Sequence, residues 1–289
     1  MRFTKMHGLG NDYVYVDAIT QDLGSVSLPE LSKAVSDRHF GVGSDGLIVI
    51  CQPETETADF RMRIFNPDGS EAEMCGNGIR CFAKYVYEHG LTEKTELRVE
   101  TGAGVIVTEL RVNGGRVEAV RVDMGEPRLR PADVPFDWQP DDQPAVEVPL
   151  RLSDGTELRV TAVSMGNPHC VIFVDDAESY AVDQVGPQVE RHPAFPRRTN
   201  VEFATVIDRG HIRMRVWERG AGETMACGTG ACATAVAAAL TDRANRRVVV
   251  HLSGGDLEIE WAEDGHIYMS GPAAEVFSGE LSQEFWAAL

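Results

Sequence analysis

The chain has 289 residues, of which 43% are hydrophobic and 25% charged, and a formal net charge of −18 at pH 7. That length is sufficient for two domains with their own cores, and so acidic a chain lacks the basic surface on which nucleic-acid binding depends. The N-terminus has no apolar signal core, and no apolar run approaches the length of a membrane span. Six cysteines fit free thiols in a reducing compartment better than a disulfide framework. We therefore expect a cytoplasmic globular protein with neither nucleic-acid nor membrane partners.

The first half of the chain is expected to consist mainly of strands. Alternating apolar residues predict strands over 2–6 and 13–17, on either side of the loop H-G-L-G-N-D. One helix is expected over 27–39, with Pro29 near its start, and another over 76–90, ending at Gly90. The remaining strands are predicted at 47–50, 60–66, 96–100, 104–112 and 116–123, with a hairpin turn at 113–115.

The segment G-V-G-S-D-G at 41–46 has the spacing of a dinucleotide fingerprint in the wrong context. Such a fingerprint follows a strand and opens a helix, whereas this segment follows a helix and precedes a strand. We therefore expect no nucleotide site here.

The second half is expected to repeat the first after a crossing connection. Residues 124 to about 147 are rich in proline and aspartate and predict a connection with a short extended piece. The later elements are a strand within 164–176, a helix over 182–190, strands within 197–207 and 212–217, a helix after Cys227, and a strand–turn–strand over 247–261.

The strongest signal is a motif that occurs twice. Residues 71–78 and 223–230 both read E-x-x-x-C-G-x-G, and the strands before them, at 60–66 and 212–218, align at the same offset. The segment 164–176 likewise resembles the G-L-G-N-D-Y-V-Y-V-D of the N-terminus. Each half thus combines strands with one prominent helix, which predicts an α/β protein of the α+β type with two pseudo-symmetric domains. We place these domains at 1–123 and 124–272.

Cys75 and Cys227 each precede a helix, which suggests acid–base chemistry. Helix N-termini stabilise a thiolate, so we expect both pKa values to be lowered toward neutrality, and the same N–H groups suit a carboxylate ligand. Two thiols on opposite faces of one substrate could remove a proton from a carbon and return one from behind, which inverts a stereocentre. The alternative is that both are small apolar core residues. The glycines beside them favour the first interpretation because they indicate close approach to the backbone.

Cofactor and metal chemistry have weaker support in the sequence. None of the four lysines stands in a convincing context for a pyridoxal phosphate Schiff base. The cysteine spacings do not match zinc ligation, and no C-x-x-C motif supports a redox dithiol. We therefore expect neither a cofactor nor a metal.

Four motifs together resemble the diaminopimelate epimerase family. They are M-H-G-L-G-N-D, N-P-D-G-S-E-x-x-x-C-G-N-G-x-R-C, S-M-G-N-P-H-C and E-R-G-A-G-E-T-x-A-C-G-T-G-A-C, and they span nearly the whole chain. The resemblance implies conversion of LL-2,6-diaminopimelate to its meso form, without pyridoxal phosphate or metal, in lysine and peptidoglycan precursor synthesis. It also implies two similar domains, each a mixed sheet curled around a central helix, with a final strand of about 273–283 returning to the first domain.

The resemblance also implies residue roles. It makes Cys75 and Cys227 the two acid–base thiols. Substrate-binding positions are Asn11, Asn66, Gly76, Asn77, Asn167, Asn200, Glu218, Arg219, Gly228 and Thr229. Among these, Gly76, Asn77, Gly228 and Thr229 begin the two helices and would hold the reacting α-carboxylate through their backbones. Arg219 suits a distal carboxylate, Glu218 an ammonium group, and the asparagines either partner.

Other residues near the motifs have less direct roles. His169 is expected to line the site and tune the thiols, or else to be a structural histidine. Asp68, Glu71 and Glu223 are expected to hold loops, while Cys81, Cys170 and Cys232 are read as packing residues. Gly46 stands where some family members carry a glutamine that touches substrate, so that contact is in doubt here.

Three alternatives remain open from the sequence. A proline or hydroxyproline racemase shares the two-thiol logic but resembles M-C-G-H-G where this chain has M-C-G-N-G. A phenazine-type isomerase of the same fold is expected to lack the paired cysteines. A non-catalytic thiol sensor is the third alternative. The sequence does not decide whether the chain forms a homodimer, nor which thiol acts on which stereoisomer.

Overall fold

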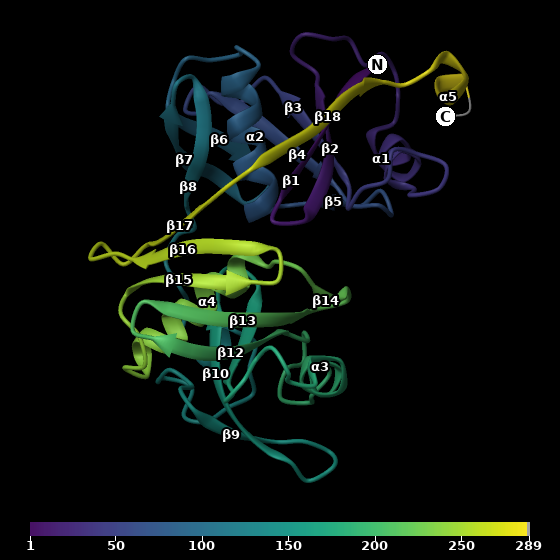
Figure 1. The fold of residues 1–289 in the computed structure, drawn as a ribbon. Coiled ribbons are helices and arrows are strands. Elements are labelled where there is room, and N and C mark those ends of the chain that lie inside the picture. The colour runs from purple at the N-terminus through teal and green to yellow at the C-terminus, as the bar shows by residue number, and fades with distance from the viewer. Residues whose placement is uncertain (288–289) are drawn as a thin grey trace. The chain divides into compact units, whose positions relative to one another are not determined.

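A computed structural model describes residues 1–287, and the chain divides into two compact units. The first unit contains residues 1–122 together with the chain from 271 onward, and the second contains residues 123–270. Figure 1 shows strands as the dominant element of both units. The fold is the α+β architecture that the sequence predicts.

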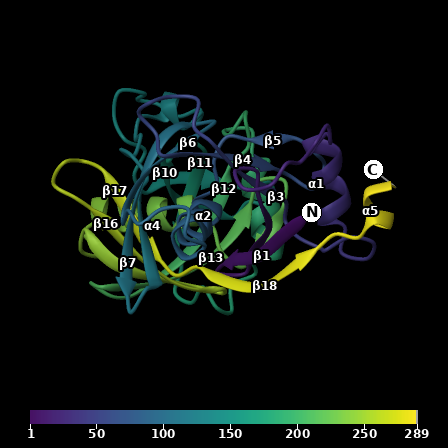
Figure 2. The ribbon, with the colours of Figure 1, turned by 90° about the horizontal axis from the view of Figure 1, so that it is seen from above.

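The first unit is a mixed sheet around one buried helix. Its strands are β1 (Arg2–Gly8), β2 (Asn11–Asp17), β3 (Leu47–Cys51), β4 (Phe60–Phe65), the short β5 (Glu71–Ala72), β6 (Glu96–Thr101), β7 (Gly104–Asn113), β8 (Arg116–Asp123) and β18 (Ala274–Glu280). Pairing runs β18–β1–β2–β3–β4–β6–β7–β8, and only β2–β3 and β4–β6 are parallel. The last strand, β18, lies beside the first, β1, as both ribbon views show (Figures 1 and 2).

Helix α2 (Gly76–Glu88) forms the centre of this unit, with strands around it in Figure 1. Its apolar side chains are fully buried, among them Ile79, Phe82 and Val86. It packs against β1, β2 and β7, while the shorter α1 (Leu28–Ser36) packs against β2, β3 and β4. A five-residue helix, α5 (Gln283–Ala287), follows β18.

The second unit repeats this pattern. Its strands are β9 (Val148–Arg151), β10 (Glu157–Ser164), β11 (Pro168–Phe173), β12 (Asn200–Asp208), β13 (His211–Glu218), the short β14 (Gly222–Thr224), β15 (Arg247–Leu252), β16 (Gly255–Trp261) and β17 (Ile267–Gly271). Pairing runs β9–β10–β11–β12–β13–β15–β16–β17, with β11–β12 and β13–β15 parallel, which is the same order of antiparallel and parallel pairs as in the first unit. Helix α4 (Gly228–Leu240) takes the place of α2, and α3 (Val182–Glu190) packs against β12, β13 and β14.

The end of helix α1 and the hairpin β9–β10 differ from the sequence-based expectation. Helix α1 ends at Ser36 rather than at residue 39, because the Asp37 carboxylate accepts hydrogen bonds from the backbone N–H groups of His39 and Phe40 and turns the chain. The hairpin β9–β10 was not assigned from the sequence, although alternating residues flank Asp154-Gly155, with Gly155 at a φ of 93°. The turn at 113–115 is confirmed, since Gly114 and Gly115 have φ values of 57° and 79°.

None of the helices within residues 1–287 is both long and apolar enough to cross a membrane.

Candidate active site

Cys75 is the N-cap residue of α2. Its Sγ accepts a hydrogen bond from the backbone N–H of Gly78 at 3.3 Å. A Cβ on Gly78 would lie 2.7 Å from Cδ1 of Ile48 and 3.5 Å from the sulfur itself. The last glycine of the motif therefore lets the thiol and β3 approach the first turn of the helix.

Strand β2 supplies the other polar groups around Cys75. Oδ1 of Asn11 lies 3.5 Å from the sulfur, and the Tyr13 hydroxyl lies 3.6 Å from it. Oδ1 of Asn11 also accepts from Nδ2 of Asn77 at 3.3 Å, while Nδ2 of Asn11 donates to Asp45 at 2.9 Å. Because the Asp45 carboxylate only accepts, it fixes the Asn11 amide with its oxygen toward the thiol.

Cys227 has the same position at the start of α4. Its Sγ accepts from the backbone N–H of Gly230 at 3.4 Å, and the Thr229 hydroxyl lies 3.4 Å from it. A Cβ on Gly230 would meet Oε1 of Glu202 at 2.7 Å. The residue is 6% exposed. Both copies of the motif thus place a thiol at the N–H groups of the first turn of a helix.

A chain of hydrogen bonds extends from Cys227 into the core of the second unit. Nδ2 of Asn167 donates to the Thr229 hydroxyl at 3.2 Å, and Oδ1 of Asn167 meets Nε2 of His169 at 3.0 Å. Nδ1 of His169 meets Oε1 of Glu202 at 2.6 Å, and both of these side chains are fully buried. His169 therefore reaches the thiol through Asn167 and Thr229, and is held by a buried carboxylate.

The expectation of lowered thiol pKa values is wrong for both cysteines. Burial raises the pKa of Cys75, although the Gly78 N–H and the Tyr13 hydroxyl act to lower it. Burial raises the pKa of Cys227 much further, and the negative charges of Glu218 and Glu202 add to this effect. The helix N-termini do favour each thiolate, but loss of solvation outweighs them.

The proposed distal residues of the second unit lie where β12 begins and β13 ends. Oδ1 of Asn200 accepts from the backbone N–H of Arg219 at 2.9 Å, and its Nδ2 donates to the Pro168 carbonyl at 3.1 Å. Glu218 accepts from the Thr224 hydroxyl, and burial raises its pKa. The exposed Arg219 donates to the Arg197 carbonyl at 3.1 Å. Asn200 thus fixes the backbone that presents both charged side chains.

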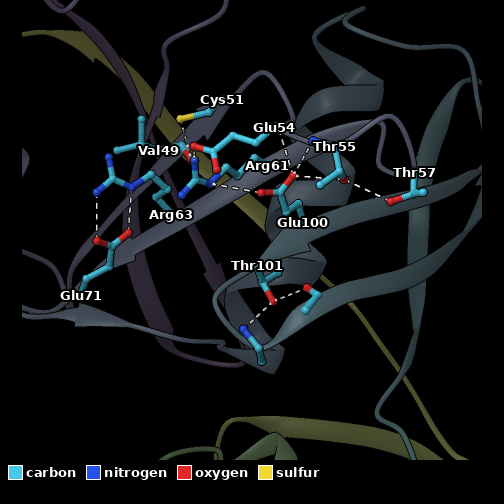
Figure 3. A network of polar contacts seen from close by, with 12 residues as sticks. Val49, Cys51, Glu54, Thr55, Thr57, Arg61, Arg63, Glu71, Glu100 and Thr101 are labelled. Atoms are coloured by element: carbon cyan, nitrogen blue, oxygen red, sulfur yellow. Dashed lines mark hydrogen bonds and ion pairs between the residues drawn. The ribbon is translucent and has the colours of Figure 1, made fainter.

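The glutamates of the repeated motif are bound by arginines. In Figure 3, Glu71 faces Arg63 in a two-pronged ion pair, with N–O distances of 2.7 and 2.9 Å. Glu223 and Arg215 repeat this pair at 2.7 and 3.0 Å. Both glutamates therefore fasten the loop before the cysteine to the preceding strand, as the sequence interpretation holds.

Asp68 has the loop-holding role expected of it, since it accepts from both the backbone and the hydroxyl of Ser70. Asn66 is a different case. Its amide donates to the Ser70 hydroxyl at 2.9 Å, and the contacts around Cys75 come from other residues. Asn66 lies in the loop that precedes Cys75, and its side-chain hydrogen bond to Ser70 stays within that loop.

The structure gathers most predicted residues into two clusters, one in each unit. Asn11, Gly76 and Asn77 accompany Cys75, while Asn167, His169, Gly228 and Thr229 accompany Cys227. Sequence reasoning missed Tyr13 and Glu202. Each stands two residues after a predicted asparagine on the same strand, so strand alternation could have indicated both.

Gly46 leaves no room for the side chain that some family members carry there. Its φ is 153°, and a Cβ would lie 2.3 Å from the Phe65 carbonyl oxygen and 3.0 Å from the Tyr13 ring. In this chain the Phe65 carbonyl and the Tyr13 ring border that position.

The remaining cysteines behave as packing residues. Cys81, Cys170 and Cys232 are at most 1% exposed, and burial raises the pKa of Cys81 to about 11. Across residues 1–287, all six cysteines are free thiols, and no group of three or more His, Cys, Asp or Glu side chains is placed to hold a metal ion.

Comparison with known protein families gives one family. The profile described as Diaminopimelate epimerase matches residues 3–130 and 161–276. A diaminopimelate epimerase of Moorella thermoacetica is 59% identical over 97% of this chain and 99% of its own length. Proteins with the same name from Pelotomaculum thermopropionicum and Methanococcus maripaludis are 58% and 51% identical, over 97% of this chain and 98% and 99% of their own lengths.

Solved structures of low sequence identity share the fold. A probable proline racemase of Agrobacterium radiobacter superposes with a TM-score of 0.70 at 15% identity, covering 98% of this chain and 93% of that chain. A phenazine biosynthesis protein of the PhzF family from Bacillus anthracis superposes with a TM-score of 0.69 at 18% identity, covering 98% and 99%. At such identities the likeness concerns the fold alone.

Proposed function

Because the chain belongs to the diaminopimelate epimerase family, we propose that it converts LL-2,6-diaminopimelate to the meso isomer with Cys75 and Cys227 as its two acid–base groups. The observation that carries this proposal is the duplicated helix N-terminus, where each unit presents a thiol beside the backbone N–H groups of a first helical turn. Each unit, 1–123 with the returning final strand and 124–272, would supply one of the two thiols.

The proposed reaction removes one proton from the α-carbon and adds one to its opposite face. One cysteine, as a thiolate, takes the α-proton and becomes a thiol. The other, as a thiol, donates its proton to the opposite face of the carbon and becomes a thiolate. The configuration at that carbon inverts, and the two sulfurs exchange protonation states. No electron changes hands, so the step needs no redox partner.

Charge develops on the α-carboxylate as the proton leaves, and the helix N-termini are suited to stabilise it. The backbones of Gly76, Asn77, Gly228 and Thr229 begin the two helices and would hold this carboxylate. Preorganised N–H groups favour the carbanion-like transition state over the ground state, which is the requirement for acceleration.

The far end of the substrate is a second amino-acid group, so it needs partners of both charges. Arg219 would bind the distal carboxylate, Glu218 the distal ammonium group, and Asn11, Asn66, Asn167 and Asn200 the remaining polar atoms. The anchoring of Arg219 by Asn200 supports this role, since it holds the backbone of the clamp in place. A substrate without a distal carboxylate would leave that guanidinium unpaired.

The product of the proposed reaction is used in the synthesis of lysine and of peptidoglycan precursors. The reaction would take place in the cytoplasm and would need neither pyridoxal phosphate nor a metal. The diaminopimelate substrate is a small molecule that the protein would release unchanged in mass.

The test is isotope exchange. The reduced, chelator-treated protein is incubated with LL-diaminopimelate in D2O, and product and α-deuterium are followed by NMR and mass spectrometry. We expect meso product with solvent deuterium at the inverted carbon, and loss of turnover in Cys75→Ala and Cys227→Ala, with Cys232→Ala as a matched control that keeps it. Exchange with proline instead of diaminopimelate would move the assignment to a racemase, and no exchange with either would contradict the proposal.

A further inference from the structure

One face of strand β2 is aimed at the first turn of helix α2. Asn11, Tyr13 and Tyr15 alternate along the strand and therefore share that face. Asn11 and Tyr13 reach Cys75, at 3.5 and 3.6 Å, whereas the Tyr15 hydroxyl donates to the Gly78 carbonyl at 2.9 Å. Two tyrosines on one strand face thus have different partners, and of the two only the Tyr13 hydroxyl bonds to the thiol.

The Tyr13 ring is held in place by the backbone at Gly46. The Gly46 carbonyl accepts from the backbone of Val14 at 3.0 Å and from the Ser44 hydroxyl at 2.9 Å, so this segment is fixed against β2. The ring packs against Gly46, since a Cβ on that glycine would lie 3.0 Å from Cε1 of Tyr13. Tyr13 is 7% exposed, so its hydroxyl has a defined place beside the sulfur.

The Tyr13 hydroxyl is a donor rather than an acceptor. Burial raises its pKa well above the usual value, and the negative charge of a Cys75 thiolate raises it further. The phenol therefore keeps its proton when the thiol loses one. A donor at this distance lowers the pKa of Cys75, in the opposite direction to burial.

The internal repeat shows that each thiol has a hydroxyl neighbour from a different element. The residue two positions after Cys227 is Thr229, whose hydroxyl lies 3.4 Å from that sulfur. The matching residue after Cys75 is Asn77, which has no hydroxyl and donates to Asn11 instead. Each thiol thus has one hydroxyl neighbour, but in the first unit that hydroxyl comes from β2.

Given the two-thiol reaction proposed above, we propose that Tyr13 is a catalytic residue whose phenol O–H donates a hydrogen bond to Cys75 each time that sulfur is a thiolate. The Cys75 thiolate is the base that takes the α-proton of one stereoisomer. In the reaction of the other stereoisomer, Cys75 starts as the thiol that protonates the carbon, and the same thiolate remains afterwards. The contact therefore serves both directions of the reaction.

The groups that share this environment are few. Besides Tyr13, the titratable or charged side chains around the thiol are Arg80 and Cys81 of α2, Tyr15 of β2 and, behind Asn11, Asp45. Substituting only the Tyr13 hydroxyl leaves all of these in place.

The experiment measures each thiol separately. Wild type, Tyr13→Phe and Tyr15→Phe are alkylated with iodoacetamide over a pH series, and the modification of Cys75 and of Cys227 is read from their peptides by mass spectrometry. A hydrogen bond to a charged group is strong enough to change the thiolate fraction about tenfold. We expect Tyr13→Phe to slow alkylation of Cys75 about tenfold below its pKa, with Cys227 unchanged and Tyr15→Phe like wild type. We expect kcat for LL-diaminopimelate to fall with it while KM stays constant.

A second replacement acts in the opposite direction. 3-Fluorotyrosine at position 13 keeps the ring and makes the hydroxyl a stronger donor, so it should speed alkylation of Cys75. The proposal is overturned if the Cys75 curve is the same in Tyr13→Phe as in wild type, or if Tyr15→Phe moves it equally. Should wild type fail to turn over diaminopimelate, the proposed function fails, while the alkylation curves still decide the role of Tyr13.

Discussion

The two thiol clusters share a backbone plan but differ in the side chains that surround it. In each, a cysteine caps a helix and accepts from the N–H three residues later, in a unit with the same order of strand pairs. The position of Tyr13 in the first repeat is that of His169 in the second. Tyr13 touches its cysteine directly, whereas His169 is paired with the buried Glu202 and acts through Asn167 and Thr229.

The equivalent asparagines also present opposite ends of their amides. Asp45 holds the amide nitrogen of Asn11, so its oxygen faces Cys75. His169 meets the oxygen of Asn167, so its nitrogen faces Thr229 beside Cys227. The two clusters thus share the main-chain N–H donors at the cysteine, but they differ in which end of the asparagine amide faces the thiol side.

This divergence makes the two thiols unequal, which suits a reaction that needs one of each protonation state. Cys75 has hydrogen-bond donors and Arg80 near it, and its pKa is raised by burial alone. Cys227 has Glu218 and Glu202 near it, and its pKa is raised well above that of an ordinary cysteine. As pH rises, Cys75 is therefore expected to lose its proton first, leaving Cys227 as the thiol.

The largest predicted effect concerns the fully buried pair of His169 and Glu202 in the second unit. Glu202→Ala removes the partner of His169 inside the core, and we expect the free energy of unfolding to fall by about 3 kcal/mol. Glu202→Gln keeps the size and one hydrogen bond, and should cost about 1 kcal/mol. Urea denaturation measures both. Equal stability of both variants and wild type would show that the pair contributes nothing.

Glu218→Gln sharpens the contrast between the thiols. The charge of Glu218 raises the pKa of Cys227, so its removal should let that thiol lose its proton at lower pH. Activity that needs Cys227 as a thiol is then lost earlier, and the alkaline limb of the profile of kcat/KM against pH should move to lower pH. Glu223→Gln, a matched change at a glutamate paired with Arg215, should leave that limb in place. If Glu218→Gln leaves the alkaline limb of the pH profile in place, the charge of Glu218 does not raise the pKa of Cys227.

The smallest predicted effect concerns the arginine–glutamate pair that occurs in both repeats. Glu71→Gln and Glu223→Gln each break an arginine pair that is partly exposed, so each should lower the free energy of unfolding by less than about 1 kcal/mol. Because the two pairs have the same geometry, we expect similar losses in the two variants by urea denaturation. A loss several times larger in one variant would contradict the equivalence.

The sequence predicts the features that depend on local pattern. The spacing of apolar residues, with glycine and proline at the element ends, indicates the strands and helices, and α3 is found at residues 182–190 as expected. The repeated motif indicates the two cysteines that cap helices α2 and α4. The resemblance to diaminopimelate epimerase gives the family, which the comparisons confirm.

The features that the sequence misses depend on what lies around a residue in space. A cysteine before a helix predicts a lowered pKa, but the desolvation that reverses it comes from strands far away in the chain. Strand alternation places Glu202 on the same face of β12 as Asn200, but its contact with His169 on β11 follows from the parallel pairing of these strands, which the local sequence does not show. The proximity of Tyr13 to Cys75 similarly requires the position of α2 against β2.

The most direct test of the unequal thiols is their titration in the unmodified protein. Wild type is alkylated over a pH series without substrate, and the rates at Cys75 and Cys227 are measured from their separate peptides. We predict that the rate at Cys75 reaches half of its maximum at lower pH than the rate at Cys227. Alkylation of Cys227 at the lower pH, or one shared titration for both thiols, would contradict the account.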